Sequence, residues 1–213
     1  MKISLDSLRS NPDFYVHECQ HQILGLLFLV VPAARKQRWN NDELHLRSLL
    51  CTPNGEIVCA GLPKFFDIAE PQEDATSLLP SLQNQMHNSE IKTYLPEKVD
   101  GTLLIRTVID GQVCFRTRGS HQLGRLSSSV LSLIESKYPN LLDPSIDIEN
   151  VGLPEGKASL LMEFVDPSKP IIVQYSEAMI KGIGIMKLSS HQLPAFYSSP
   201  QFVAQMHEQF ALQ

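Results

Sequence analysis

A lysine and an arginine stand at the two open ends of a predicted β-hairpin. They are Lys98, which is followed by Asp100 and Gly101, and Arg118. A deprotonated amine is a nucleophile, and a guanidinium group binds phosphate through two parallel hydrogen bonds. Glycine at 101 lets the backbone approach a ligand closely. The pair therefore predicts attack on a phosphate-bearing substrate, against the alternative that Lys98 is only a solvated turn lysine.

The hairpin that brings these two residues together is predicted from its turn. Two β-rich runs surround Asp110-Gly111, a pair that supplies the positive φ angles of a two-residue type I′ turn. Counting back from that turn sets Leu103 opposite Arg118. Arg118 is then expected roughly 7 Å along the strand from Gly101.

A second set of residues matches a zinc motif. His17, Glu18 and His21 fit H-E-x-x-H, which on a helix puts two imidazole rings on one face for zinc and supplies a general base. A zinc hydrolase also needs a third protein ligand, for which only Glu43 and His45 are candidates. The alternative is a half-exposed amphipathic helix without metal.

The composition is that of an ordinary globular protein. The chain has 213 residues, 43% hydrophobic and 19% charged, with a formal net charge of −5. Such a charge excludes bulk positive charge as the means of coating nucleic acid or anionic membranes. The charge is uneven, however: −4 over 1–91, +3 over 92–125 and −4 over 126–213. The basic segment holds both Lys98 and Arg118, and we expect one domain over 1–213.

The cysteines favour a reducing compartment, and the apolar runs favour a protein without a membrane span. The four cysteines show no Cys-x-x-Cys pairing. The most apolar run, 23–34, is broken by Pro32 and falls short of the roughly 20 residues that cross a bilayer. Acidic residues near the start contradict a basic leader. We therefore expect a cytoplasmic monomer with no membrane contact.

Hydrophobic periodicity and turn signals predict an α+β fold, in which antiparallel sheets are flanked by helices. We expect helices over 13–22, over 127–137 and from 199 onward, a hairpin over 102–118, a loop with one short helix over 67–90, and strands over 26–31, 45–51, 56–60, 158–165, 171–175 and 180–187. The last helix has no glycine, proline or basic last turn to end it, so we expect it to continue past the chain.

Four blocks in order resemble the covalent nucleotidyltransferases, and among them the ATP-dependent RNA ligases of the phage repair type. The blocks are Arg47 with Leu62-Pro63-Lys64-Phe65-Phe66-Asp67, then Lys98-Val99-Asp100-Gly101, then Arg116-Thr117-Arg118-Gly119-Ser120, and then Leu161-Met162-Glu163-Phe164-Val165 with Pro170-Ile171-Ile172-Val173-Gln174-Tyr175. The resemblance implies a ligase or capping-enzyme type of nucleotidyltransferase domain.

The resemblance also implies roles for individual residues. Lys98 would attack the α-phosphate of ATP to give lysyl-AMP, with magnesium and basic groups neutralising charge. The β- and γ-phosphates would be held by Arg47 and Lys64, and a ribose hydroxyl by Glu163. The adenine would lie near the backbone of Glu97 and near Phe66 or Phe164. The substrate would be RNA ends, 5′-phosphate and 3′-hydroxyl, with a repair kinase or phosphatase as a partner.

The sequence departs from the family in three places. Arg118 stands where many relatives have lysine, and Asp67 where the usual residue is asparagine. After Glu163, neither the Glu-Gly-x-Val block, which helps bind metal, nor the Lys-x-Lys block appears. We therefore expect an N-terminal part of the domain that alone adenylates slowly or not at all. The alternatives are a nucleotide- or RNA-binding protein without ligase activity and, third, the zinc hydrolase.

Overall fold

A computed structural model describes residues 2–66, 97–146, 157–189 and 193–212. The chain divides into two compact units. The first combines Met1–Pro63 with Val99–Gln213, and the second is Lys64–Lys98. All named strands belong to the first unit.

The first sheet is antiparallel and has four strands in the order β1-β2-β3-β4. These are β1 (Phe14–His21), β2 (Gly25–Pro32), β3 (Leu49–Cys51) and β4 (Ile57–Ala60). Helix α1 (Leu5–Ser10) packs beside β1, and the 3-10 helix η1 (Asn41–Arg47) lies between β2 and β3 in sequence.

The second sheet is also antiparallel, with five strands in the order β6-β5-β7-β8-β9. These are β5 (Thr102–Ile109), β6 (Gln112–Thr117), β7 (Lys157–Val165), β8 (Met179–Leu188) and β9 (Ala195–Tyr197). One face carries Ile105, Leu161 and Met186 into a core shared with the first sheet. Since side chains alternate along a strand, the other face carries Leu104 and Leu160 into a second core.

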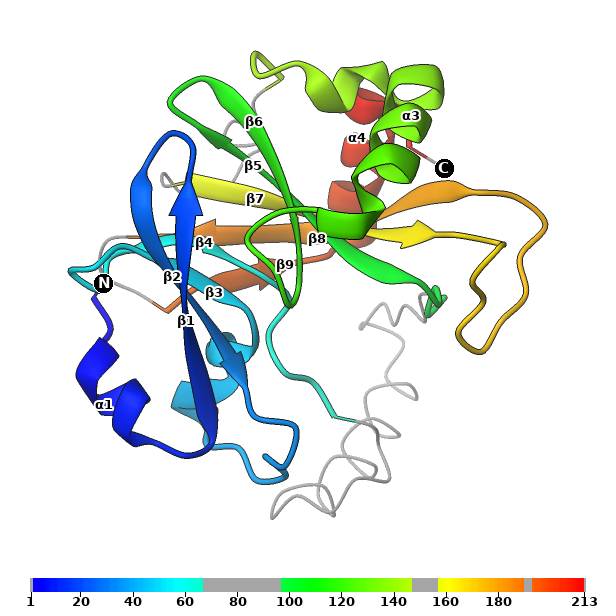
Figure 1. Ribbon diagram of the computed structural model, residues 1–213. Helices are drawn as coiled ribbons and strands as arrows, with labels where there is room; N and C mark the ends of the chain where they lie inside the picture. Colours follow the sequence, from blue (N-terminus) through cyan, green and yellow to red (C-terminus); the bar gives the residue numbers. More distant parts are fainter. Residues whose placement is uncertain (1, 67–96, 147–156, 190–192, 213) are drawn as a thin grey trace, which may run out of the picture. The chain divides into compact units, whose positions relative to one another are not determined.

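Helices cover that second face (Figure 1). They are α3 (Ser127–Lys137), the short 3-10 helices η2 (Gly124–Leu126) and η3 (Pro139–Leu142), and α4 (Pro200–Phe210). Arg106 of β5 points among them and is fully buried. Its Nε donates to Leu141 O at 2.7 Å, its Nη2 donates to Asp143 O at 2.6 Å, and its guanidinium group lies over the Phe210 ring. Burial lowers the pKa of Arg106 to about 10, so the charge of its guanidinium group is stabilised by hydrogen bonds rather than by solvent.

Buried polar side chains link the two sheets. Arg116 of β6 donates from Nη1 to Ser48 Oγ at 2.8 Å and from Nη2 to Ser48 O at 3.2 Å. Its Nε donates to Cys59 Sγ at 3.2 Å. Cys59 also contacts the hydroxyls of Thr107 and Ser159, at 3.1 and 3.3 Å. A hydrogen-bonded polar layer therefore lies between the sheets, beside the apolar side chains of the shared core.

Several predicted elements are confirmed, including the α+β class, the helix over 127–137 and the strands near 26–31, 56–60, 158–165 and 180–187. The hairpin is confirmed in detail: Ile109 pairs with Gln112, and the φ angles of Asp110 and Gly111 are 47° and 73°. Its pairing ends at Leu104 and Thr117, so the next residues on the two sides are Leu103 and Arg118. The loop over 67–90 lies outside the described residues.

Four expectations are wrong. Residues 14–21 form strand β1 rather than a helix, because their backbone pairs with β2 along its whole length. Residues 45–47 end the helix η1 rather than begin a strand. Residues 171–175 are a loop, since β8 begins only at Met179. Helix α4 ends inside the chain: Ala211 is left-handed with φ of 52°, and Leu212 N donates to His207 O at 3.0 Å. Among the helices of the described ranges, none is long and apolar enough to cross a membrane.

Candidate functional site

The nine site residues predicted from the sequence divide between the two units. Lys64, Phe66, Glu97 and Lys98 belong to the second unit, and Arg47, Asp100, Gly101, Arg118 and Glu163 to the first. In the second unit, Lys64 Nζ lies 4.5 Å from the centre of the Phe66 ring, and Lys98 is exposed. The expected approach of Lys98 to Arg118 joins residues of different units and stays a prediction. Within the first unit, the structure shows the contacts of Asp100 and Gly101, which follow Lys98 in the sequence.

Gly101 lies against β7 at the start of β5. A Cβ added to this glycine would overlap Phe164 O and would come within 3.1 Å of Glu163 Cγ. The residues that follow continue the contact, since Thr102 pairs with Phe164 and Leu103 with Glu163. Only glycine fits here, as expected for close backbone approach, although the neighbour is a strand of the protein itself.

Asp100 joins the beginning of β5 to the loop between β7 and β8. Its carboxylate Oδ2 accepts hydrogen bonds from the backbone N–H groups of Ile172 and Val173, the second at 2.9 Å. Its own N–H donates to the hydroxyl of Tyr175 at 3.0 Å. These three hydrogen bonds fix the turn that immediately follows Lys98.

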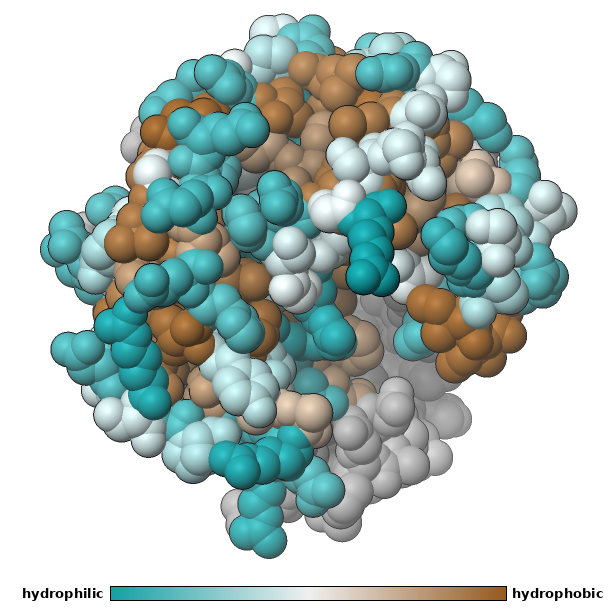
Figure 2. All heavy atoms as spheres, viewed as in Figure 1, coloured by the Kyte–Doolittle hydropathy of each residue, from teal (hydrophilic) through white to brown (hydrophobic). Residues whose placement is uncertain are grey.

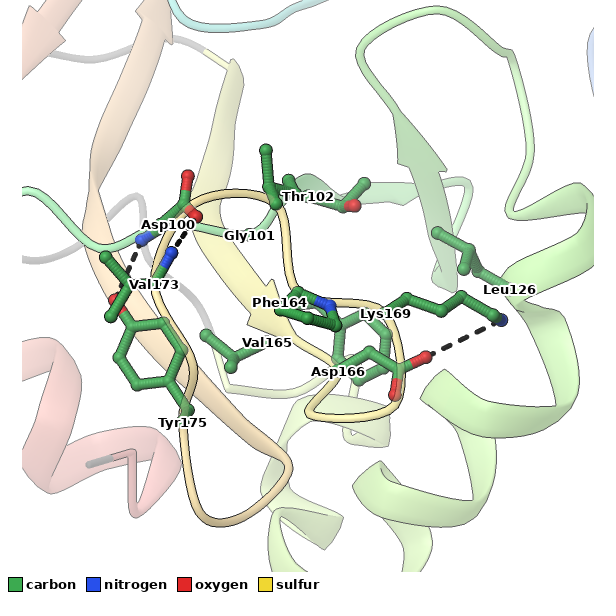
Figure 3. Close-up of a pocket in the computed structure, with 12 residues that line it drawn as sticks. Asp100, Gly101, Thr102, Leu126, Phe164, Val165, Asp166, Lys169, Val173 and Tyr175 are labelled. Carbon is green, nitrogen blue, oxygen red and sulfur yellow. Dashed lines mark hydrogen bonds and ion pairs between the residues drawn. The ribbon is translucent and has the colours of Figure 1, made fainter.

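The loop held by Asp100 presents apolar side chains to solvent. Ile172 is 83% exposed and Ile171 62%, and the loop carries brown surface in Figure 2. Beside it a shallow pocket is walled by the start of β5, the end of β7, the loop and Leu126 (Figure 3). Phe164 and Val165 of β7 line this pocket, and Glu163 does not.

Arg47 lies at the end of η1, which a buried lysine holds in place. The Nζ of Lys36 is 2.9 Å from Glu43 Oε2 and 3.3 Å from Asp13 Oδ2, and it lies over the rings of Phe14 and Trp39. Its side chain is only 2% exposed. Arg47 itself is half-buried and donates from Nη1 to Pro63 O at 3.4 Å. Lys36 thus holds η1, whose last residue is Arg47, in place.

Arg118 directly follows β6 and is exposed. Its carbonyl oxygen accepts a hydrogen bond of 2.7 Å from the hydroxyl of Ser48, the residue after Arg47. The two predicted phosphate-binding arginines are therefore joined through one serine, although Arg47 ends η1 and Arg118 follows β6.

Glu163 completes a charged cluster with these arginines. On β7 it pairs with Leu103 of β5 on one side and with Lys181 of β8 on the other. Burial lowers the pKa of Arg47, the charge of Arg118 lowers it further, and the charge of Glu163 raises it. Both neighbours thus lie within electrostatic reach of Arg47. Two cations beside a hydrogen-bond acceptor are suited to an anionic ligand that also carries hydroxyl groups.

The zinc hypothesis is wrong. His17 and His21 belong to strand β1, where residues four apart are separated by roughly 13 Å, too far to share an ion. His21 Nδ1 instead accepts from the N–H groups of Ile23 and Leu24, at 3.2 and 3.3 Å. In the part of the chain that the structure describes, no group of three or more histidine, cysteine or acidic residues could hold a metal ion.

Sequence reasoning missed Ser48, Arg116 and Tyr175. Ser48 carries no signal on its own, since one serine beside a β-rich run is commonplace. Arg116 and Tyr175 stand within blocks that resemble the ligases, but no role was predicted for Arg116, and the apolar residues before Tyr175 favour a strand. Only the pairing of distant segments shows what these three residues hold.

No protein-family model matches the chain. No curated protein matches it either.

Proposed function

We propose that this protein is an adenylyltransferase of the RNA ligase type, which forms lysyl-AMP at Lys98 and joins 5′-phosphate and 3′-hydroxyl ends of RNA. One observation carries the proposal. Strand β5, which begins four residues after Lys98, lies between β6, which leads to Arg118, and β7, which holds Glu163. Arg47 lies within electrostatic reach of both charged groups.

The donor set of this cluster fits ATP. Arg47 and Arg118 would neutralise phosphate oxygens, and Glu163 would accept a hydrogen bond from a ribose hydroxyl. The Nζ lone pair of Lys98 would attack the α-phosphorus, and the bond from that phosphorus to the bridging oxygen would break. Pyrophosphate would leave, and the amine proton would pass to solvent. A lysine reacts only after losing that proton, which neighbouring cations and desolvation favour.

The basic groups would act mainly by positioning and by stabilising charge. Phosphoryl transfer requires little covalent chemistry of the protein, so the alignment of amine, phosphorus and leaving oxygen determines the rate. Magnesium would arrive with ATP as part of the substrate. Among the described residues, no group of three or more histidine, cysteine or acidic side chains could hold an ion.

The test is a covalent adduct. The protein at its full encoded length is incubated with magnesium and ATP labelled at either the α- or the γ-phosphate. We expect α-label to stay on the protein through denaturation and γ-label to leave with pyrophosphate. Lys98→Ala should abolish the adduct, and Lys137→Ala, at an exposed lysine of α3, should not.

Two results would overturn the proposal. One is an absence of α-labelled adduct although ATP binds, which would favour the nucleotide-binding alternative. The other is an adduct that Lys98→Ala leaves undiminished. RNA joining is then measured as circularisation of a 5′-phosphorylated single strand, which should require Lys98 as well.

A further inference from the structure

Ser48 occupies the point where the two sheets and the two arginines of the charged cluster meet. It is fully buried, directly follows Arg47, and lies in the polar layer between the sheets. Its hydroxyl donates to Arg118 O at 2.7 Å and accepts from Arg116 Nη1 at 2.8 Å. Its carbonyl oxygen accepts from Gly61 N at 2.7 Å and Arg116 Nη2 at 3.2 Å. Ser48 therefore uses both its side chain and its backbone to bind three other residues, which come from two segments.

The surroundings of Ser48 leave it little freedom to move. A Cβ added to Gly61, the residue after β4, would lie 2.9 Å from Ser48 Cβ and 3.0 Å from Ile105 Cδ1, so the backbone of Gly61 lies directly against Ser48. Arg116 is anchored independently by its contacts with Cys59 Sγ and Thr117 O. Since buried polar groups are costly to leave without partners, this junction has one arrangement.

The junction also keeps like charges together. Arg47 and Arg118 approach closely enough for the charge of one to lower the pKa of the other. Such an approach is unfavourable between the two cations themselves, and the charge of Glu163 offsets part of it. The hydrogen bond from Ser48, the residue after Arg47, to the carbonyl oxygen of Arg118 connects the backbones of the two arginines.

We propose that Ser48 is a positioning residue. Its hydroxyl sets the separation of Arg47 and Arg118, and thereby determines how tightly the two arginines bind the phosphate groups of a nucleotide. The inference rests on the proposed function, because it assumes that a nucleotide occupies the cluster. It adds a residue that touches no substrate and that acts through the backbone of Arg118.

The experiment measures ATP dissociation constants of the full-length protein by calorimetric titration. Ser48→Ala removes the hydroxyl that donates to Arg118 O. We expect ATP to bind about tenfold more weakly, as for the loss of one hydrogen bond between an arginine and a phosphate group. The matched control is Ser159→Ala, which removes another fully buried hydroxyl of the same layer that contacts Thr107 and Cys59. We expect it to lower thermal stability about as much while leaving ATP affinity unchanged.

Combination with Arg118→Ala separates positioning from general damage to the fold. If Ser48 acts through Arg118, Ser48→Ala weakens ATP binding in the wild-type background and has no further effect once Arg118 is alanine. Equal ATP affinity of Ser48→Ala and Ser159→Ala overturns the inference, as does an undiminished effect in the Arg118→Ala background. A failure of the proposed function looks different, because the wild-type protein itself then forms no adduct with ATP. If the wild-type protein also fails to bind ATP, the inference falls with the proposed function.

Should Ser48→Ala not fold, Ser48→Cys keeps a weak hydrogen-bonding group of nearly the same size at this position. We expect an intermediate loss of ATP affinity for this variant, since a thiol donates more weakly than a hydroxyl. The folded Ser48→Cys protein would contradict the inference if it bound ATP as tightly as the wild-type protein although Arg118 O had lost its donor.

Discussion

The hydroxyl of Tyr175 accepts a hydrogen bond from the backbone N–H of Asp100, across 75 residues of sequence. With the two loop amides that donate to the Asp100 carboxylate, it fastens the loop after β7 to the turn that follows Lys98. A second tyrosine makes the same kind of contact elsewhere: Tyr138 OH accepts from Ile180 N at 3.4 Å in the helix-covered core. The two tyrosines therefore form a natural pair of test and control.

Tyr175→Phe should release the amide of Asp100. We expect faster hydrogen exchange at Asp100, measured by NMR, with a loss of about 1 kcal/mol in the free energy of unfolding for the missing hydrogen bond. Tyr138→Phe should instead speed exchange at Ile180 and leave Asp100 unchanged. Unaltered exchange at Asp100 in Tyr175→Phe would show that the hydroxyl does not hold this turn.

Gly101→Ala should disrupt the start of the β5–β7 pairing, because the new methyl group overlaps Phe164 O. Overpacking of this kind costs about 1–3 kcal/mol, which urea denaturation would reveal as a lower midpoint. Gly119→Ala is the control, since a Cβ there has nothing within 4 Å and the backbone has no positive φ. Equal midpoints for the two variants would refute the close approach at Gly101.

Lys36→Met should loosen η1. The substitution leaves the Glu43 carboxylate, 17% exposed, without the ammonium group that lies 2.9 Å from it, and removal of one partner of a buried ion pair costs about 3–5 kcal/mol. Arg35→Met, at an exposed neighbour that donates only to Pro12 O, should change the unfolding free energy by less than about 1 kcal/mol. We also expect weaker ATP binding in Lys36→Met, because η1 carries Arg47. A stability equal to that of Arg35→Met would contradict this role of Lys36.

Mild acid should destabilise the protein through the buried imidazole ring of His45 and the half-buried ring of His21. Burial lowers the pKa of His45, against a smaller opposing effect of Asp42, and burial together with His121 lowers the pKa of His21. The folded state thus favours neutral rings, whereas the unfolded chain takes up protons near pH 6.5. This stabilisation is complete above about pH 6.5 and is lost progressively as the pH falls below it.

Thermal unfolding between pH 5 and 8 measures this dependence. His45→Gln should flatten the fall of the melting temperature below pH 6.5, while His17→Gln, at an exposed position of β1, should leave it unchanged. The opposite sign, with higher stability at pH 5.5 than at pH 7.5, would contradict the assignment.

Local signals predicted the elements that depend only on neighbouring residues. Asp110-Gly111 fixes its hairpin because both residues adopt positive φ angles, which few other pairs tolerate. The helix over 127–137 likewise follows from the spacing of Val130 and Ile134, both of which are fully buried. The approximate placement of Arg118 beside the start of β5 follows from the same register counting.

Errors arose where a distant segment decides the local conformation. Asn11-Pro12-Asp13 resembles a helix start, but the Asn11 side chain accepts from Asp13 N at 2.9 Å in a turn that leads into β1. Ile172 and Val173 have high β-propensity, yet Asp100 takes their N–H groups away from any strand. Neither contact could be predicted from its own segment, and the same holds for Ser48 and Arg116.

The bond between Ser48 and Arg116 spans 68 residues, and the entire second unit lies within that span. During synthesis at about 5–20 residues per second, Arg116 follows Ser48 after roughly 3–14 s. Throughout that interval the Ser48 hydroxyl lacks the Arg116 side chain and the Arg118 carbonyl as partners. The first unit can therefore complete its folding only after the second unit has been made, which makes the order of translation part of how the arginine pair is assembled.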